Sequence, residues 1–335
     1  METRQLGRTG LRVPVLCLGT MTFGQQCDRD TSFEILDRSL EGGLDFLDTA
    51  DVYPLGGSAQ TVGRTEELIG EWLQLRNNRD RIVLATKCRG QMGRGANDAG
   101  LSRQHILAAC EASLRRLRTD RIDLYQTHFF DPDVRIEETL RALEDLVRAG
   151  KVRYVGCSNY PAWRLAEAIM TARELGIEGY VSLQPRYNIL YREIETELLP
   201  LCSSEGLGVL VYNPLAGGFL SGKHKLAPEP EDQGRFTLGA AGKMYRHRYW
   251  QEAQFAAVAR LKKGVESRGL DLVSVAVAWV VARPGVTSAI IGASKPSQLA
   301  SSLAAADLEL DESLRAACDA LWWELPRRPV AEGYR

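Results

Sequence analysis

The sequence predicts an α/β fold, a (β/α)8 TIM barrel with an N-terminal β-hairpin and long loops at the C-terminal mouth of the barrel. Three observations predict it. Short apolar segments rich in β-forming residues recur along the 335 residues, helical patterns separate them, and polar residues follow several of them directly. Strands that alternate with helices pair in parallel through right-handed crossovers, and eight such units close most naturally into a barrel. A doubly wound open sheet is the alternative.

The expected elements follow one another in a regular order. Residues 3–13 read as a hairpin with a glycine turn, which would plug the floor of the barrel. The expected barrel strands are Val15–Leu18, Leu44–Leu47, Ile82–Ala85, Ile122–Gln126, Val152–Gly156, Val181–Leu183, Val209–Tyr212 and Thr287–Ile291.

Two of the segments between the strands illustrate the helical pattern. Ser102–Leu117 has one apolar face, and Ser102 is a suitable N-cap. That face consists of Ile106, Cys110, Ser113, Leu114 and Leu117. Asp131–Arg148 behaves likewise, and Gly150 is placed to end this helix. Its inward residues are Leu140, Leu143, Leu146 and Val147.

Two segments depart from the alternation of strands and helices. The segment from Asn213 to about Tyr249 is rich in Gly, Pro and Lys and reads as a long loop, and the residues beyond Leu310 read as a tail. Loops of this length in a compact domain are usually functional or disordered. The sequence contains no internal repeat and no linker, so we expect a single domain over residues 1–335.

The composition is that of an ordinary globular protein. With 44% hydrophobic residues, 25% charged residues and a formal net charge of −1, it excludes wholesale disorder and indicates no nucleic-acid partner. The arginine cluster at residues 115–118 falls where a helix should end and reads as a solvated helix end. The most apolar stretch, Leu272–Ala282, is far shorter than the about 20 residues that span a bilayer, and residues 1–10 lack the apolar core of a signal peptide. We therefore expect a cytoplasmic protein with no membrane partner.

The cysteines and histidines are scattered along the chain. Seven cysteines without a CxxC pair indicate reduced thiols rather than a disulfide framework. The four histidines have neither HxH nor HExxH spacing, so we expect no metal site. Helices on the outside of a barrel can pair, so the sequence is compatible with a homo-oligomer.

Polar side chains follow three successive predicted strands. Asp48 and Tyr53 come after the second strand, Lys87 after the third and His128 after the fourth. Taken singly, they read as a turn residue, a surface aromatic, a solvated amine and a loop histidine. Together, they lie at the C-terminal mouth of the predicted barrel, where barrel enzymes have their active sites. They therefore predict a catalytic site.

The residue types suggest a mechanism. A free phenol has a pKa of about 10, so Tyr53 needs a nearby cation to stabilise its phenolate, and Lys87 can supply one. Asp48 would keep that ammonium charged and positioned, and neutral His128 could orient a substrate carbonyl. This assembly protonates an oxygen but has no reductant of its own.

These residues resemble those of the aldo-keto reductases, in the branch that includes potassium channel β subunits and bacterial general-stress-type aldo-keto reductases. The resemblance runs from Arg4 to about Leu303 through LGTMTFG, FLDTADVY, ATK, SLRRLRTDRIDLYQTH, GKVRYVGCSN, LQPRYN, VYNPLAGGFLSGK and IIGAS. It implies a barrel that binds NADPH or NADH in an extended form and passes a hydride to a small-molecule carbonyl substrate. The family's catalytic tetrad matches Asp48, Tyr53, Lys87 and His128, with Tyr53 as the general acid.

The resemblance also implies where the cofactor binds. The groups that hold the nicotinamide carboxamide match Ser158, Asn159 and Gln184, and the ring that stacks on the nicotinamide matches Tyr212. The pyrophosphate loop matches Pro214, Leu215, Gly218, Leu220, Gly222 and Lys223. The adenosine phosphate end matches Gly292, Ser294, Lys295 and Gln298, at the start of a helix, where anions bind readily.

The chain departs from the family pattern at two places. Ser301 and Ser302 stand where relatives show Glu-Asn to grip adenine, so Ser302 occupies an adenine contact with a shorter side chain. The loop Pro54–Arg64 is longer than the family minimum, and with Arg89–Gly100 and the loop after Tyr212 it should shape the substrate pocket. Its polar, glycine-rich composition favours a hydroxylated or polar carbonyl substrate, such as a keto sugar.

The cofactor preference and three competing interpretations remain open on the sequence. Ser294 and Lys295 could contact a 2′-phosphate, which favours NADPH over NADH.

Channel β subunits keep the tetrad, so a regulatory cofactor-binding protein with little turnover is an alternative. It is disfavoured because the barrel begins almost at Met1. GGFLSGKH resembles a P-loop but has histidine in place of Ser or Thr. A metalloenzyme would use His128 with Asp131 and Asp133.

Overall fold

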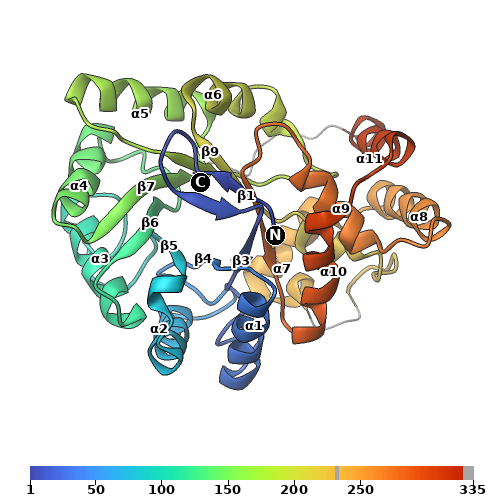
Figure 1. Ribbon diagram of the computed structural model, residues 1–335, viewed down its shortest axis with the longest axis horizontal. Helices are drawn as coiled ribbons and strands as arrows, with labels where there is room; N and C mark the ends of the chain where they lie inside the picture. The colour runs from blue at the N-terminus through green and yellow to red at the C-terminus, as the bar shows by residue number, and fades with distance from the viewer. Residues whose placement is uncertain (231–233, 327–335) are drawn as a thin grey trace.

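The protein, a computed structural model described here for residues 1–230 and 234–326, contains a closed parallel barrel (Figure 1). The strand order around the barrel is β10-β3-β4-β5-β6-β7-β8-β9. The strands are β3 Leu16–Gly19, β4 Phe46–Asp48, β5 Val83–Cys88, β6 Ile122–Thr127, β7 Val152–Ser158, β8 Ser182–Gln184, β9 Gly208–Tyr212 and β10 Ser288–Gly292. The predicted barrel class and all of its predicted strands are confirmed, and the open sheet is excluded because β10 pairs with both β9 and β3.

The N-terminal hairpin closes one end of the barrel, as predicted. Strands β1 (Thr3–Gln5) and β2 (Arg12–Pro14) pair antiparallel and lie across that end in Figure 1. Leu6 and Val13 of the hairpin are fully buried and pack on inward-facing strand residues such as Phe46 and Leu124. This apolar plug leaves the C-terminal ends of the strands as the open mouth.

Helices surround the barrel and alternate with its strands. The α-helices are α1 Arg29–Glu41, α2 Arg64–Arg76, α3 Arg103–Leu117, α4 Ile136–Arg148, α5 Ala162–Leu175, α6 Leu198–Glu205, α7 Gly239–Tyr249, α8 Glu252–Glu266, α9 Leu272–Val281, α10 Leu299–Ala304 and α11 Glu312–Glu324. Short 3-10 helices are η1 Arg79–Arg81, η2 Glu193–Glu195, η3 Ala216–Ser221, η4 Arg235–Thr237, η5 Pro296–Gln298 and η6 Ala305–Asp307. None of the helices in the described part of the chain combines the length and apolar character needed to cross a bilayer.

The two example helices form with one difference from expectation. Ser102 caps α3, since its hydroxyl accepts a hydrogen bond from the amide of His105 at 3.2 Å. Helix α4 begins at Ile136 and not at Asp131. The carboxylate of Asp131 instead accepts hydrogen bonds from the amides of Leu101 and Asp133, which hold residue 131 in a turn.

The two segments predicted as a loop and a tail contain helices. Helices η3, η4 and α7 lie between Asn213 and Tyr249, and α11 lies beyond Leu310. The long segment folds because its aromatic residues form a cluster around Phe219. Residues 231–233 of this loop and residues 327–335 of the tail lie outside the described part.

The arginine cluster is not simply a solvated helix end. Arg116 at the end of α3 donates from Nε to Oε2 of Glu66 at 2.7 Å, and Glu66 is completely buried. Arg118 forms the C-cap of the helix with a left-handed backbone, φ 51°. The pattern of residues 115–118 could not show this pairing, because Glu66 comes from a different helix.

Candidate active site

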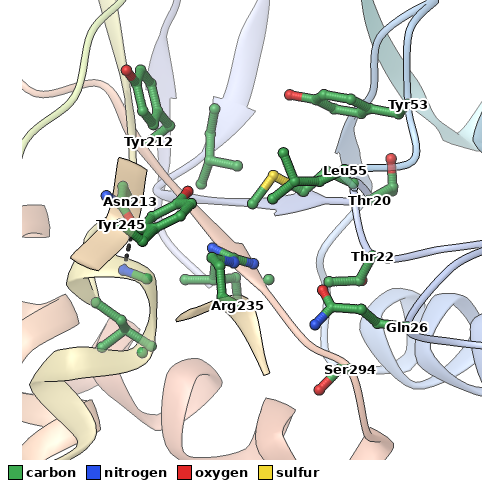
Figure 2. A pocket seen from close by; sticks show the side chains of 18 of the residues that line it. Thr20, Thr22, Gln26, Tyr53, Leu55, Tyr212, Asn213, Arg235, Tyr245 and Ser294 are labelled. Carbon is green, nitrogen blue, oxygen red and sulfur yellow. Dashed lines mark hydrogen bonds between the residues drawn. The ribbon is translucent and has the colours of Figure 1, made fainter. Parts of the chain in front are cut away.

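A cavity of about 1660 Å³ opens at the C-terminal ends of the strands. In Figure 2, Tyr53, Thr20 and Gln26 lie on one side of it, facing Tyr212 and Tyr245 on the other. The cavity is much larger than a site for one small molecule needs. It has room for a dinucleotide together with a substrate.

The centre of the predicted tetrad is an ion pair between neighbouring strands. Asp48 ends β4, Lys87 lies near the end of β5, and the ammonium of Lys87 is 2.5 Å from Oδ1 of Asp48. The same ammonium donates to the carbonyl oxygen of Thr49 at 2.8 Å. Burial alone would lower the pKa of Lys87, but Asp48 and Tyr53 outweigh it and raise this pKa, so Lys87 remains a cation.

Tyr53 and His128 lie in front of this ion pair. The Lys87 ammonium is 5.2 Å from the centroid of the Tyr53 ring, and the rings of Tyr53 and His128 meet edge to face with centroids 5.8 Å apart. Burial raises the pKa of Tyr53, while Lys87 opposes the rise, so the phenol keeps its proton at neutral pH. Burial, with the charges of Lys87 and Arg89, holds the pKa of His128 well below its usual range, so its imidazole is neutral.

Two glutamines complete the surroundings of the Asp48 carboxylate. Gln184 at the end of β8 donates from Nε2 to Oδ2 of Asp48 at 2.8 Å, and Gln126 on β6 donates to the same oxygen at 3.1 Å. Gln184 also donates to Oε1 of Gln126 at 3.2 Å. The residue assigned to the cofactor carboxamide is therefore in direct contact with the tetrad, and Gln126 is a site residue that the sequence analysis missed.

The other groups expected near the carboxamide form one network. The hydroxyl of Tyr212 donates to Oδ1 of Asn159 at 2.8 Å, and Nδ2 of Asn159 donates to the carbonyl oxygen of His128 at 3.0 Å. The hydroxyl of Ser158 donates to the carbonyl oxygen of Gln184 at 2.8 Å. Asn159 has a left-handed backbone, φ 58°, a conformation that asparagine adopts more readily than most residues. Strands β6 to β9 thus hold these groups in one place.

The loop after Tyr212 brings part of the predicted pyrophosphate contacts to the cavity. The lining residues from this set are Pro214, Leu215, Gly218 and Lys223. Leu220 is fully buried in the core, and neither it nor Gly222 lines the cavity. A Cβ added at Gly218 would meet no heavy atom within 4 Å, so the backbone here borders open space.

The predicted adenosine end also lines the cavity. Its members are Gly292, Ser294, Lys295, Gln298 and Ser302. Oε1 of Gln298 accepts hydrogen bonds from the amides of Ser294 and Lys295 at 2.8 and 3.3 Å, so these donors are already occupied. The helix expected here, α10, has 6 residues and follows the short η5, so a strong helix dipole does not contribute.

Several cavity residues were not identified from the sequence. Arg186, Arg235, Tyr245 and Arg248 all line it. Only Arg186 carried a usable signal, because it follows Gln184 by two residues at the end of a predicted strand. The others come from the segment that was read as an irregular loop, where no periodicity places a side chain.

The two competing chemistries find no support in the geometry. No group of three or more His, Cys, Asp or Glu side chains within residues 1–230 and 234–326 is arranged to hold a metal. The Asp131 carboxylate is engaged by backbone amides. The segment that resembles a P-loop forms η3, with φ 73° at Gly217 and 97° at Gly218, and no helix of ordinary length follows it directly.

Comparisons with known proteins agree with this geometry. A model of the "Aldo/keto reductase family" matches residues 15–322. The "Uncharacterized oxidoreductase YrpG" of Bacillus subtilis is 40% identical over 319 residues, 94% of each chain. The "Probable voltage-gated potassium channel subunit beta" of Arabidopsis thaliana is 36% identical over 311 residues, 92% of each chain. The "Norsolorinic acid reductase stcV" of Emericella nidulans is 34% identical over 316 residues, 90% of this chain and 76% of that protein. The chain therefore belongs to the aldo/keto reductase family, and relatives named as oxidoreductases and reductases support an oxidoreductase function in general.

Proposed function

We propose that the protein reduces a small-molecule aldehyde or ketone to an alcohol with NADPH, using Tyr53 as the general acid. One observation carries the proposal. The buried ion pair of Lys87 and Asp48 lies behind the Tyr53 ring at the cavity, an arrangement that serves to stabilise a phenolate after its proton has left.

Each member of the tetrad has one task in this reaction. Neutral His128 donates a hydrogen bond to the substrate carbonyl oxygen and orients it toward Tyr53. When bound, the reduced nicotinamide supplies the hydride that the carbonyl carbon receives. Tyr53 gives its phenolic proton to the carbonyl oxygen, which completes the alcohol. Lys87 stabilises the resulting phenolate until a solvent proton restores Tyr53.

The residues of the cavity fit a dinucleotide cofactor. The Tyr212 ring offers a stacking surface, and Ser158 and Asn159 lie beside it. Lys223, Arg235 and Lys295 supply cations for its phosphates. Cations beyond those that a pyrophosphate needs favour NADPH, with its extra 2′-phosphate, over NADH.

We also infer that the chain acts as one domain in the cytoplasm. All seven cysteines are buried and unpaired, which suits a reducing compartment. The likeness to a protein named as a channel β subunit supports a second candidate, a cofactor-binding auxiliary protein with little turnover. The two candidates differ in turnover and not in cofactor binding.

The test combines a titration with a turnover assay. Quenching of intrinsic fluorescence on adding NADPH and, separately, NADH should saturate, with a lower Kd for NADPH. NADPH oxidation should then be followed with a panel of aldehydes and keto sugars. Binding with turnover on several carbonyls supports the reductase, binding without turnover supports the auxiliary protein, and the absence of binding would contradict both.

A further inference from the structure

The described lining of the cavity carries an excess of positive charge. Its cationic residues include Arg186, Lys223, Arg235 and Lys295, and its acidic residue is Asp48, which Lys87 neutralises. Lys223 follows η3, Arg235 begins η4 and Lys295 precedes η5, so these three belong to the part of the mouth where the cofactor phosphates are expected. Arg186 comes instead from the end of β8, and the phosphates do not account for it.

Arg186 follows a residue that contacts the tetrad. Gln184, two residues earlier, reaches Asp48 with its side chain. Residues two apart in an extended chain point to the same side and are about 7 Å apart, so Arg186 follows Gln184 up the inner wall of the mouth. Its backbone pairs with that of Tyr212 in an isolated parallel bridge, which keeps it beside the proposed nicotinamide site.

The guanidinium of Arg186 is held by aromatic rings and not by a carboxylate. Its Cζ lies 3.6 Å from the centroid of the Tyr191 ring, and no acidic residue in the described part of the chain forms an ion pair with it. The nearby Tyr249 hydroxyl already accepts hydrogen bonds from Asn188 at 3.1 Å and Asn213 at 2.9 Å. A half-buried guanidinium with five N–H donors and no anion beside it costs free energy that an anionic ligand would recover.

The rings around Arg186 also oppose any loss of its charge. Burial alone would lower the pKa of Arg186, but the phenols of Tyr249, Tyr191 and Tyr212 outweigh burial and raise it. The cation is therefore permanent at every working pH. One face of the guanidinium lies on the Tyr191 ring, so a planar acceptor would approach its edge.

We propose that Arg186 binds a carboxylate of the substrate, so that the preferred substrates are aldehydes or ketones that carry a carboxylate group. The inference rests on the proposed function, since it assigns a substrate class to the same site. A carboxylate matches the planar fork of a guanidinium and can accept two parallel hydrogen bonds from it. The phenol ring of Tyr191 and the neighbouring lining residues Ile194 and Leu198 offer an apolar wall for the rest of the molecule.

The C-terminal helix α11 holds this substrate-binding arginine from behind. Trp322 of α11 meets the Tyr191 ring edge to face, with centroids 6.3 Å apart. Asp319 of the same helix accepts hydrogen bonds from Arg192 at 2.9 Å and from Arg283 at 3.0 Å. The segment read from the sequence as a tail therefore fixes the ring on which Arg186 rests.

The first test compares two substrates that differ in charge and little in shape. Steady-state reduction of 4-carboxybenzaldehyde and of 4-formylbenzamide should be measured with NADPH for the wild type, Arg186→Gln, Arg186→Lys and the exposed control Arg141→Gln. We expect the wild type to prefer the carboxylate and Arg186→Gln to lower this ratio of kcat/KM values by at least about tenfold. Arg186→Lys should restore part of the ratio, and Arg141→Gln should not change it.

The second test does not depend on turnover. Isothermal titration calorimetry should compare benzoate with benzamide as ligands of the protein saturated with NADPH. Tighter binding of benzoate that is lost in Arg186→Gln supports the inference. Equal binding of the two, or a preference that survives in Arg186→Gln, overturns it while the reductase proposal stands. Weaker NADPH binding by Arg186→Gln, with an unchanged preference, would make Arg186 a cofactor residue and also overturn it.

Failure of the proposed function looks different in these tests. If NADPH does not bind, or binds without reduction of any carbonyl in the panel, the reductase proposal fails. The comparison of benzoate with benzamide, made on the protein without NADPH where NADPH does not bind, still decides whether Arg186 forms a carboxylate site. Thermal melting of each variant shows whether Arg186→Gln is folded. Arg186→Lys retains the positive charge and therefore tests the carboxylate preference in a second variant.

Discussion

Gln184 donates a hydrogen bond from Nε2 to Oδ2 of Asp48 over 2.8 Å, and so joins the proposed cofactor site to the proposed catalytic tetrad. Lys87 occupies the other carboxylate oxygen at 2.5 Å, and Gln126 shares Oδ2. Both oxygens of Asp48 are thus engaged within the protein. In the proposed reaction Asp48 therefore positions Lys87 rather than exchanging protons with a substrate, and Tyr53 is the proposed proton donor.

Replacing Tyr53 with Phe should remove the reaction and keep the site. The ring of phenylalanine preserves the contact with His128 but has no proton for the carbonyl oxygen, so kcat should fall by about 100-fold to 10,000-fold. The Kd of NADPH, measured by fluorescence quenching, should stay within about twofold of the wild type. Retained turnover would show that another group donates the proton.

The pH profile of reduction should be flat through neutrality. Burial keeps the pKa of His128 well below 6.5, so this imidazole stays neutral as the pH falls to about 6. Burial raises the pKa of Tyr53 above 10, so activity should be lost only as the pH rises through that raised value. The dependence of kcat/KM on pH between 6 and 11 checks both directions. A fall in activity below pH 7 would mean that His128 titrates normally.

Replacing Asp51 with Asn should change how stability depends on pH. Asp51 is fully buried, neither carboxylate oxygen has a hydrogen-bond partner, and burial and then Glu66 raise its pKa from 3.8 to about 8. Between about pH 4 and pH 8, the folded protein therefore keeps a proton on Asp51 that the unfolded chain has lost. Across this window the free energy of unfolding contributed by Asp51 falls as pH rises, by up to about 1.4 kcal/mol per pH unit.

Asparagine at position 51 is neutral at every pH, so this slope should disappear. Urea unfolding at pH 5 and pH 8.5 should show Asp51→Asn gaining stability over the wild type at the higher pH. Asp133→Asn, at an exposed position, serves as the control and should follow the wild type. An unchanged slope in Asp51→Asn would mean that Asp51 is ionised in the folded protein.

Replacing Arg116 with Leu should destabilise the barrel strongly. Glu66 is completely buried and would keep only the hydrogen bond from the Thr86 hydroxyl, so we expect a loss of about 3–5 kcal/mol in the free energy of unfolding. The control is Arg148→Leu, which breaks a more exposed pair with Glu144 and should cost at most about 1 kcal/mol. The double change Arg116→Leu with Glu66→Met should recover most of the loss, and a result without recovery would contradict a charge-based cost.

Replacing Ser302 with Asn should tighten cofactor binding. Ser302 lines the cavity near the proposed adenine site, and the longer amide adds a donor and an acceptor there. One added hydrogen bond corresponds to a decrease of about threefold to tenfold in the Kd of NADPH. Ser313→Asn on the exposed side of α11 is the matched control. An unchanged Kd would mean that another contact holds the adenine.

The sequence by itself determined the barrel and the four groups at its mouth. A buried strand is an apolar run, and the polar residue that ends it must lie at the mouth, so FLDTADVY, ATK and YQTH already placed Asp48, Tyr53, Lys87 and His128 at one edge. These inferences are local, because each depends on one strand and the residues directly after it.

Only the tertiary structure decided what depends on distant partners. The pairing of Glu66 with Arg116, the contact of Gln184 with Asp48 and the support of Tyr191 by Trp322 each join elements that are far apart along the chain. The helices η4 and α7 formed where no periodicity was visible, because aromatic packing around Phe219 outweighs local propensity. Side-chain contacts of this kind follow from the closure of the barrel in space, which the order of residues along the chain does not display.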